Sequence, residues 1–215
     1  MISVILCTYN RADYLPRPLG SLRRQTADSW ELVVVDDGST DETSSVLARE
    51  LAGASFPSRI LSVGKNGGHA RARNRGVEEA RGDWVTFLDS DDAYDPEHLA
   101  RLEKAAEEAP EVDFWYGMAT IYGDPFVADR KDPTRQIHLG DCRIGGTFFF
   151  RRAKALALGG FPEVVYADDA AFFAQVEAAG WVMRPYDAHT YQYHRDAADS
   201  LTQGPPAEAY PEEPS

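Results

Sequence analysis

Cysteines and long apolar runs are both scarce in this sequence of 215 residues. Cys7 and Cys142 form neither a disulfide framework nor a zinc-ligand pattern, and Cys7, in an apolar stretch, is expected to be a buried inert thiol. No run of about 18 apolar residues exists, so the sequence predicts no membrane span. Residues 1–8 are too short and lack the basic start of a signal peptide, so they are expected to form a strand. We expect a cytoplasmic protein, with a peripheral place at the inner membrane left open.

Positive charge is also in short supply. The chain has 22 Lys and Arg against 35 Asp and Glu, a formal net charge of −13 at pH 7. This charge argues against nucleic acid or an anionic membrane as a partner. A phosphorylated ligand would therefore need a local cation or a few well-placed Arg and Lys. The 43% hydrophobic content is enough for the core of one soluble domain.

Apolar runs alternate with amphipathic stretches over the first half of the chain. Strands are predicted at 2–7, 31–35, 59–63 and 84–88, and helices at 12–25, 40–51, 69–80 and 96–108. This alternation predicts an α/β fold with a mostly parallel sheet. From residue 113 the rhythm changes, with strands expected at 114–122 and 147–151 and a helix at 168–179. Residues 203–215, with four prolines and three glutamates, are expected to form a disordered tail.

The fourth predicted strand ends on three carboxylates, Asp89, Asp91 and Asp92. Clustered like charges at the end of a buried strand are costly unless a cation neutralises them, and oxygen ligands suit Mg²⁺ or Mn²⁺. The carboxyl end of a strand is also where open α/β sheets bind ligands. A calcium loop of the EF-hand type does not fit, because Tyr94 and Ala100 replace its required glycine and glutamate. A solvated turn that caps the next helix is the alternative.

Polar loops follow two other predicted strands. Thr8-Tyr9-Asn10-Arg11 follows the first strand, and Asp36-Asp37-Gly38-Ser39 follows the second. In a right-handed α/β sheet these loops share an edge with the Asp89 cluster, so their residues can converge. A carboxylate in the second loop could accept a hydrogen bond from the ring N–H of a nucleobase. An ordinary Asp-Gly turn is the alternative.

The stretch from Gly64 to Gly76 is glycine-rich and basic in an acidic protein. It is not a Walker loop, because no Gly-Lys-Ser/Thr follows. Glycines ahead of a helix let backbone N–H groups approach an anion. Arg71, Arg73 and Arg75 fan over different faces of the predicted helix, and a solvated face explains one or two of them. We expect Arg73 to point at a ligand.

Taken in order, these motifs resemble those of family 2 glycosyltransferases with the GT-A fold. The residues that carry the resemblance are Thr8-Tyr9-Asn10-Arg11, Val35 to Asp41, Ala72-Arg73-Asn74 with Gly76, and Phe87 to Asp92. The resemblance covers roughly residues 1 to 200. It implies one domain over 1–202, a Rossmann-like nucleotide-diphospho-sugar transferase sandwich. Residues 1–92 would form its nucleotide-binding half and residues 93–202 its acceptor half.

The resemblance also implies a donor site for a nucleotide-diphosphate sugar. An Mn²⁺ or Mg²⁺ ion would lie between the diphosphate and Asp91. Asp37 and Thr8 would hold the base with Arg11 nearby, and Asp89 or Asp92 would support the ribose or the ion. The donor-binding residues implied in this way are Thr8, Tyr9, Arg11, Asp37, Arg73, Asp89 and Asp92.

The family's second half supplies a catalytic base, usually the Asp of a Glu-Asp pair that opens a helix. Here the matching pair is Asp168-Asp169, after Tyr166-Ala167, so the base is expected to be Asp169. Helix capping by both residues is the alternative. His194 resembles a late histidine that some relatives use near the ion, and a structural or surface histidine is the alternative. Phe173-Ala174-Gln175 stands where the family often has an arginine, so acceptor-side details stay open.

Together these features imply an inverting, metal-dependent transfer of one sugar to an acceptor hydroxyl, with a UDP-sugar favoured as donor. The acceptor could be a glycan, a lipid-linked glycan or a small molecule. The Gln-x-x-Arg-Trp signature of processive relatives is absent, so single-sugar transfer is favoured. A sugar nucleotidyltransferase and a non-catalytic nucleotide-sugar-binding protein are the alternatives. Trp115, Tyr116 and Phe148 to Phe150 could stack on a sugar, but core packing explains them equally well.

Overall fold

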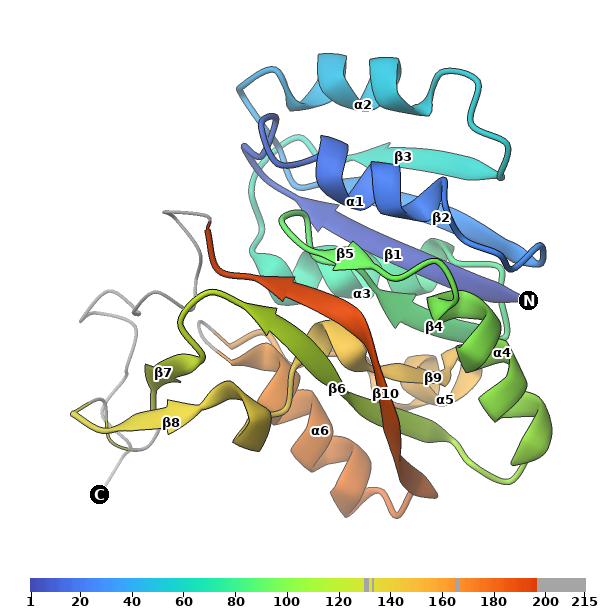
Figure 1. Cartoon of the computed structure of the whole chain (residues 1–215), viewed down its shortest axis with the longest axis vertical. Helices are drawn as coiled ribbons and strands as arrows, with labels where there is room; N and C mark the ends of the chain where they lie inside the picture. The colour runs from blue at the N-terminus through green and yellow to red at the C-terminus, as the bar shows by residue number, and fades with distance from the viewer. Residues whose placement is uncertain (130–131, 133, 165–166, 197–215) are drawn as a thin grey trace.

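A single eight-stranded sheet with helices on both faces makes up most of the computed structural model, which describes residues 1–129, 132, 134–164 and 167–196 (Figure 1). The strand order is β3-β2-β1-β4-β9-β6-β10-β5. The strands of this sheet are β1 (Ile2–Thr8), β2 (Trp30–Asp36), β3 (Ser58–Ser62), β4 (Trp84–Phe87), β5 (Ala93–Tyr94), β6 (Phe114–Tyr122), β9 (Phe149–Arg151) and β10 (Met183–His194). The expected tail at 203–215 and Tyr166 lie outside the described residues.

The sheet is mostly parallel, which confirms the predicted α/β fold. β1 pairs in parallel with β2 and β4, β2 with β3, and β6 with β10. β9 is antiparallel to both β4 and β6, and β5 is antiparallel to β10. Six strands therefore point the same way, and their carboxyl ends meet at one edge of the sheet, where α/β sheets bind ligands.

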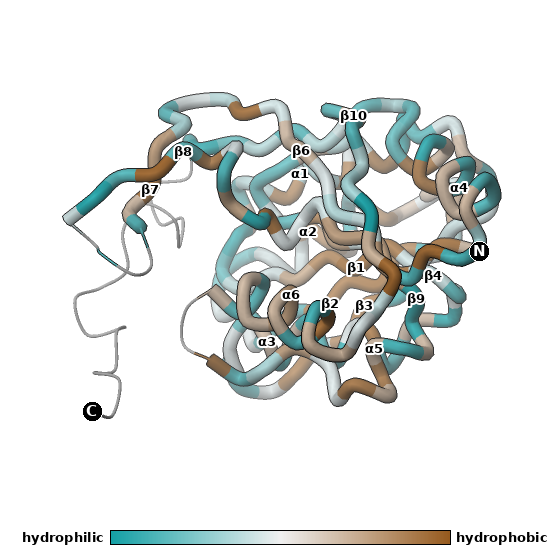
Figure 2. The backbone as a smooth tube through the Cα atoms, turned by 90° about the horizontal axis from the view of Figure 1, so that it is seen from below, coloured by the Kyte–Doolittle hydropathy of each residue, from teal (hydrophilic) through white to brown (hydrophobic). Residues whose placement is uncertain are grey.

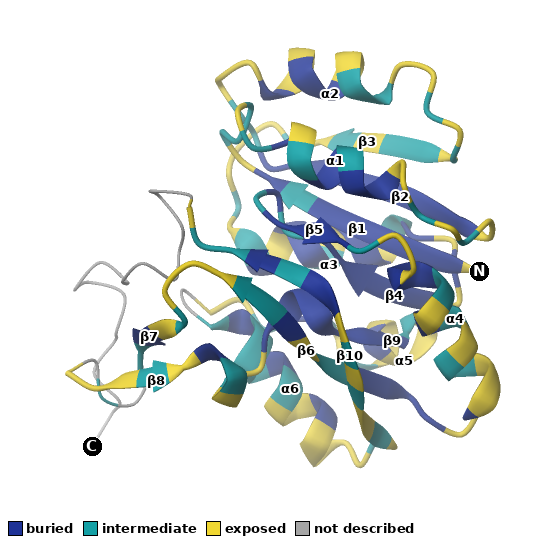
Figure 3. Cartoon of the chain, viewed as in Figure 1, coloured by how far each residue is buried: buried dark blue, intermediate teal, exposed yellow. Residues whose placement is uncertain are grey.

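Helices cover both faces of the sheet, and each face has its own apolar core. One core takes side chains from α1 (Pro16–Leu22), α2 (Thr43–Leu51) and α4 (His98–Glu108). The other takes side chains from α3 (His69–Glu79), α5 (Arg152–Leu158) and α6 (Asp168–Ala178). The central strands β1, β2 and β4 are buried along almost their whole length, as parallel strands covered on both faces should be (Figure 3).

The structure corrects several predicted element boundaries, including the end of the first helix at Leu22 and the start of the second at Thr43. The first helix begins at Pro16 and not at residue 12, because a proline without an N–H fits the first turn of a helix. The fourth helix begins at His98, two residues later than expected. The expected strand at 147–151 is wrong at its start, since Thr147 belongs to the 3-10 turn η2 (Gly145–Thr147) and the strand is Phe149–Arg151.

Several elements of the second half were not predicted at all. They are β5, α5, the long strand β10, the 3-10 turn η1 (Leu139–Asp141) and a hairpin of β7 (Phe126–Ala128) and β8 (Gln136–His138). The hairpin stands off the main body, as Figure 2 shows. Among the described helices, none has the length and apolar character needed to cross a bilayer.

Candidate active site

The loops that follow β1 and β2 are tied together at the carboxyl edge of the sheet. The Asn10 side-chain oxygen accepts a hydrogen bond from the backbone N–H of Thr40 at 2.8 Å, and the Asn10 N–H donates to Ser39 Oγ at 2.9 Å. The Asp37 N–H donates to the carbonyl of Thr8 at 2.9 Å. The predicted convergence of these two loops is therefore present in the structure.

Asp37 is buried, and its carboxylate faces the glycine-rich loop ahead of α3. It accepts hydrogen bonds from the backbone N–H groups of Gly67, at 3.0 and 3.1 Å, and Gly68, at 2.9 Å. Gly38 has a positive φ of 84°, and a Cβ on it would lie 2.9 Å from the backbone nitrogen of Asn66. Only glycine fits so close an approach of the two loops. Contact of Asp37 with a nucleobase stays a prediction.

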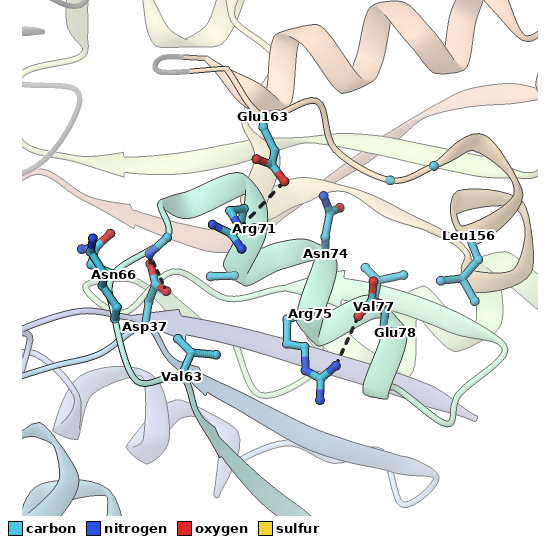
Figure 4. A pocket seen from close by; sticks show the side chains of 15 residues that line it. Asp37, Val63, Asn66, Arg71, Asn74, Arg75, Val77, Glu78, Leu156 and Glu163 are labelled. Atoms are coloured by element: carbon cyan, nitrogen blue, oxygen red, sulfur yellow. Dashed lines mark hydrogen bonds and ion pairs between the residues drawn. The ribbon is translucent and has the colours of Figure 1, made fainter.

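A cavity of about 800 Å³ opens beside this loop, along the outer side of α3 (Figure 4). Asp37 lies at one end of it, and Arg71 Nε lies 3.8 Å from Glu163 Oε1 across it. The described residues that line the cavity include Asp37 but neither Asp89 nor Asp91. The cavity therefore adjoins the predicted donor site at its base-binding end and leaves out the acidic loop after β4.

Arg73 is buried among carboxylates and aromatic rings. Its side chain is 2% exposed, and its guanidinium carbon lies 5.1 Å from the Phe87 ring centroid and 5.3 Å from that of Phe161. Nη1 donates to Asp168 Oδ2 at 3.1 Å, and Nη2 lies 3.6 Å from Asp89 Oδ1. The guanidinium thus faces two carboxylates of the protein, and its predicted contact with a ligand is untested.

His69 completes a ring of polar side chains that includes Arg73. Its Nδ1 lies 3.3 Å from Asp168 Oδ1, and its Nε2 lies 3.9 Å from Asp89 Oδ1. His69, Asp168, Arg73 and Asp89 therefore form a closed ring, which we call the α3–α6 ring. It joins the end of β4 and the start of α3 to the start of α6. The other arginines of α3 are exposed on its outer side, so the predicted fan is confirmed.

The acidic loop after β4 is held by Tyr191 of β10. The Tyr191 hydroxyl lies 2.6 Å from Asp92 Oδ2 and 3.4 Å from Asp89 Oδ2. The backbone N–H of His194 donates to Asp92 Oδ1 at 2.7 Å. Burial, followed by the charges of Asp89 and Asp91, raises the pKa of Asp92 well above its usual range. Asp92 is thus bound within the protein on both of its oxygens.

Asp91 differs from Asp92 in how its carboxylate is supported. Its carbonyl oxygen accepts a hydrogen bond from Arg17 Nη1. Burial and then the charge of Asp89 raise the pKa of the Asp91 carboxyl to about 6, while Arg11 and Arg17 act in the opposite direction. A raised pKa means that the ionised form lacks compensation in the protein. A bound cation would provide it.

Asp169 lies at the start of α6, next to the α3–α6 ring. Its Oδ2 accepts a hydrogen bond from the Gly145 N–H at 3.1 Å, and its Oδ1 accepts one from the Ala170 N–H at 2.7 Å. Burial raises the pKa of Asp169, Arg73 lowers it, and the neighbouring Asp168 raises it again. For Asp168 burial also acts upward, but Arg73 and His69 outweigh it and hold that pKa well below its usual range. The pKa values of the two adjacent carboxyl groups therefore shift in opposite directions.

The residues of the first loop surround the end of β1. Thr8 is buried, and its Oγ1 has no hydrogen-bond partner in the described part of the chain. Tyr9 is 43% exposed, and the Arg11 guanidinium lies over the Tyr14 ring at 5.4 Å from its centroid. A buried hydroxyl without a partner is costly, so Thr8 suits a contact with a bound ligand.

Cys7 shows that these groups share one neighbourhood. Cys7 is half-buried, not fully buried as predicted. Burial raises the pKa of its thiol, and the charges of Arg73, Asp89, Asp168 and Asp37 also act on it. Asp37 and the α3–α6 ring therefore flank the end of the same strand.

His194, predicted to lie near the ion, reaches Asp92 through its backbone. Its ring stacks on Tyr122 with the centroids 4.7 Å apart and 7° between the planes. Burial and then Arg17 lower the pKa of His194. Metal binding by its ring stays a prediction.

The oxygen donors at this edge fit a divalent ion that a ligand helps to hold. Among the described residues, no three His, Cys, Asp or Glu side chains are arranged to bind a metal ion on their own. Mg²⁺ is usually bound through one or two carboxylates together with substrate phosphates. Asp91, with its raised pKa and with Asp89 beside it, suits such a partial site.

Sequence reasoning missed four residues that shape the site: His69, Gly145, Gly146 and Tyr191. The adjacent pair Gly145-Gly146 was the available signal, since it often marks a close approach. A Cβ on Gly146 would lie 2.2 Å from the Tyr191 hydroxyl, and one on Gly145 would lie 2.7 Å from Arg73 Nη2.

The aromatic residues considered for sugar stacking divide into two groups. Phe148, Phe149 and Phe150 are fully buried and Trp115 nearly so, which is core packing. Tyr116 is half-buried, with the Arg143 guanidinium 4.8 Å from its ring centroid.

Comparison with known proteins agrees with these features. The sequence profile of Glycosyl transferase family 2 matches residues 3–169. An uncharacterized glycosyltransferase of Haemophilus influenzae is 35% identical over 170 residues, which are 74% of this chain and 56% of that protein. A PGL/p-HBAD biosynthesis glycosyltransferase of Mycobacterium bovis is 41% identical over 137 residues, which are 60% of this chain and 53% of that protein. The chain spans about half the length of these curated relatives.

Solved structures extend the comparison. S. aureus TarS 1–349 in complex with UDP matches with a TM-score of 0.72 at 26% identity, over 90% of this chain and 60% of that one. The mannosyltransferase PcManGT of Pyrobaculum calidifontis, in complex with GDP-Man and Mn²⁺, matches with a TM-score of 0.73 at 21% identity, over 94% of this chain and 58% of that one. The second likeness concerns the fold alone. The predicted GT-A fold is confirmed, and the chain belongs to glycosyl transferase family 2.

Proposed function

We propose that the protein is an inverting, metal-dependent glycosyltransferase that moves one sugar from a nucleotide-diphosphate sugar to an acceptor hydroxyl. The observation that carries this proposal is the arrangement around the α3–α6 ring. The ring links the loop of Asp91, whose carboxylate lacks compensation, to the start of α6, where Asp169 is half-buried and has a raised pKa. Asp91 as an ion-binding carboxylate and Asp169 as a base would lie on two sides of the α3–α6 ring. This arrangement suits the displacement of a nucleoside diphosphate from a sugar carbon by an acceptor hydroxyl.

The donor would lie across the ends of β1, β2 and β4. Thr8 offers a buried hydroxyl that none of the described residues pairs with, and Tyr9 offers an exposed ring, while Asp37 and Arg11 lie on the flanking loops. A UDP-sugar is favoured, and the UDP complex of the related TarS fragment supports that choice. Arg73, Asp89 and Asp92 would act from inside the protein, since each is held by contacts with other residues.

Asp91 would hold Mn²⁺ or Mg²⁺ against the diphosphate, with His194 as a further candidate ligand. The bound ion would act as a Lewis acid that stabilises the charge growing on the leaving nucleoside diphosphate. On the protein side, the ion would offset the cost of ionising Asp91 that burial and the charge of Asp89 create. Asp89 and Asp92 would add to the local negative field without leaving Tyr191.

Asp169 would take the proton from the acceptor hydroxyl as the new bond forms. Its raised pKa makes it a better base than an exposed aspartate, and a positioned base contributes about 10²–10⁴ in rate. One base and one displacement invert the anomeric centre, as in inverting hydrolases. We expect a hexosyltransferase that acts once on each acceptor, with Tyr116 and the β7–β8 hairpin as parts of the acceptor side.

A binding experiment tests the donor and ion parts of this proposal. Thermal unfolding is followed with nucleoside diphosphates, with and without Mn²⁺. We expect UDP with Mn²⁺ to raise the melting temperature, since a ligand that binds the folded state stabilises it by mass action. The Asp91→Ala variant should lose the Mn²⁺-dependent part of the increase. An increase of equal size in Asp91→Ala would contradict the ion assignment, and no increase with any nucleotide would contradict the donor class.

A further inference from the structure

The α3–α6 ring includes an aspartate that the proposed reaction does not use. Asp168 touches Arg73 at 3.1 Å and His69 at 3.3 Å, and both partners also face Asp89. We propose that Asp168 is a positioning residue: through Arg73 and His69 it fixes the start of α6 to the end of β4 and so holds Asp169 in place. The kinetic part of this inference rests on the function proposed above.

The anchor of the ring, Arg73, is closely packed. Arg73 is 2% exposed and lies between the rings of Phe87 and Phe161. Phe161 is itself clamped by Asn74, which accepts its backbone N–H at 2.7 Å and donates to its carbonyl at 2.9 Å. A buried guanidinium needs a partner carboxylate. Asp168 therefore meets Arg73 at a position that is set by the packing of Phe87 and Phe161.

The same guanidinium controls both sides of Asp169. On one side Arg73 binds Asp168, the residue that precedes Asp169. On the other side Arg73 packs against Gly145, whose N–H donates to Asp169 Oδ2 at 3.1 Å. A Cβ on Gly145 would lie 2.7 Å from Arg73 Nη2 and 2.9 Å from the Asp169 Cβ. The room for the Asp169 side chain is thus defined by groups that Arg73 fixes.

The backbone before α6 also needs the ion pair. Ala167 has a φ of 56° and ψ of 45°, the left-handed conformation that alanine rarely adopts. Such a conformation persists only where surrounding contacts impose it. The contacts of Asp168 with Arg73 and His69 come directly after this residue. Without the charge of Asp168, the turn can relax and carry Asp169 away from Gly145.

Hydrogen exchange gives a direct test, because two backbone amides bind the Asp169 carboxylate. In Asp168→Asn we expect the Gly145 and Ala170 amides to exchange about tenfold faster. A displacement of about 1 Å costs roughly 10² in kcat. Affinity for UDP with Mn²⁺ should stay within about threefold of wild type, since Asp89 keeps Arg73. Asp168→Glu, which restores the charge and is the family's usual residue, should recover most of kcat.

Asp113→Asn is the matched control. Asp113 is buried to the same degree as Asp168, at 7% against 8% exposed, and is paired with Lys154 and Arg151 at the opposite edge of the sheet. The Asp113→Asn variant should leave both kcat and the hydrogen exchange of the Gly145 amide unchanged.

The outcomes separate the inference from the function. Wild-type exchange at Gly145 in Asp168→Asn, or an equal loss of kcat in Asp113→Asn, would overturn the positioning role. If Asp168→Asn does not fold, His69→Gln is the second variant, because it removes the half-exposed member of the ring. It should show the same faster exchange at Gly145 and Ala170 to a smaller extent. Wild-type exchange in His69→Gln would then overturn the positioning role of Asp168. If the wild-type chain neither transfers nor hydrolyses any nucleotide sugar, the proposed function fails. The exchange data then still decide whether Asp168 holds Asp169.

Discussion

At the amino-terminal edge of the sheet, Glu31 is 4% exposed and is met by donors on both of its oxygens. Ser3 Oγ and the Arg81 N–H donate to Oε1 at 2.7 and 2.6 Å, and Arg59 Nη2 donates to Oε2 at 3.1 Å. At the carboxyl-terminal edge, by contrast, the Asp91 carboxyl has its pKa raised to about 6 by burial and by Asp89. The buried Glu31 is thus compensated at one edge, whereas the half-buried Asp91 is under-compensated at the other.

The same contrast holds for three further acidic residues. Asp113, again at the amino edge, accepts a hydrogen bond from the Val182 N–H at 3.0 Å and pairs with Lys154. Asp92 and Asp169, at the carboxyl edge, both have raised pKa values, for which burial is the largest cause. Structural carboxylates are satisfied by the fold itself, whereas clustered carboxylates with perturbed pKa values mark functional sites. The comparison explains how one acidic protein can have stabilising aspartates and costly ones in the same sheet.

The largest expected effect separates the two edges by activity. Asp169→Asn removes the proposed base but keeps its shape, so the transfer rate should fall by about 10³-fold. Affinity for UDP with Mn²⁺ should be retained, which calorimetry can check. The control is Glu31→Gln at the amino edge, which should transfer at the wild-type rate. An Asp169→Asn variant as active as the wild type would remove Asp169 from the role of base and with it the functional half of the comparison.

The second effect separates the edges by stability. Asp113→Asn and Glu31→Gln each remove the charge of a buried carboxylate that pairs with half-buried or exposed cations, so each should lower the free energy of unfolding by about 2 kcal/mol. The figure is below that of a fully buried pair because the Lys154 and Arg59 side chains are partly exposed. Urea unfolding measures the change. A loss of transfer without a loss of stability in either variant would show that the amino edge is not the structural one.

Most elements in the first half of the fold could be predicted from the sequence, because the patterns that specify them are local. β2 is an unbroken run of apolar and β-branched residues, and the helix signals that follow each strand are equally short-range. β10 could not be predicted in this way, because it contains Pro185 and Asp187 and its register with β6 shifts between Tyr186 and Tyr191. Its sequence therefore does not resemble that of a buried strand.

The site divides in the same way. Asp91 and Asp169 stand in contiguous motifs, so the sequence and the family resemblance could single them out as candidate site residues, and their roles stay predictions. Tyr191 lies 99 positions from Asp92, and no local pattern reveals that its hydroxyl binds that carboxylate. Arg73 was identified as important, but its direction could not be foreseen, because its partner Asp168 is 95 positions away. Residue types at a site can thus be predicted locally, whereas their pairing depends on the fold.

The smallest expected effect is a change in stability that has opposite signs at the two edges. Removing the charge of Asp91 should stabilise the protein, whereas removing that of Glu31 should destabilise it. The folded-state pKa of Asp91 is about 6 against an ordinary 3.8, so the folded protein holds a proton that the unfolded chain releases. Stability is then unaffected below about pH 4, falls as the pH rises to about 6, and stays lower above it. With a chelator present, Asp91→Asn should therefore be more stable than wild type by about 1–2 kcal/mol at pH 7.5 and equal to it near pH 4.

Thermal or urea unfolding at the two pH values measures this difference, and Glu31→Gln, destabilising at pH 7.5, is the control. Mn²⁺ with UDP should then reverse the order, because the ligand stabilises the chain that has the Asp91 carboxylate and much less the chain that lacks it. A wild-type chain more stable than Asp91→Asn at pH 7.5 without metal would mean that the protein already compensates Asp91. In that case the two edges would not differ, and the need for a cation at the carboxyl edge would lose its physical basis.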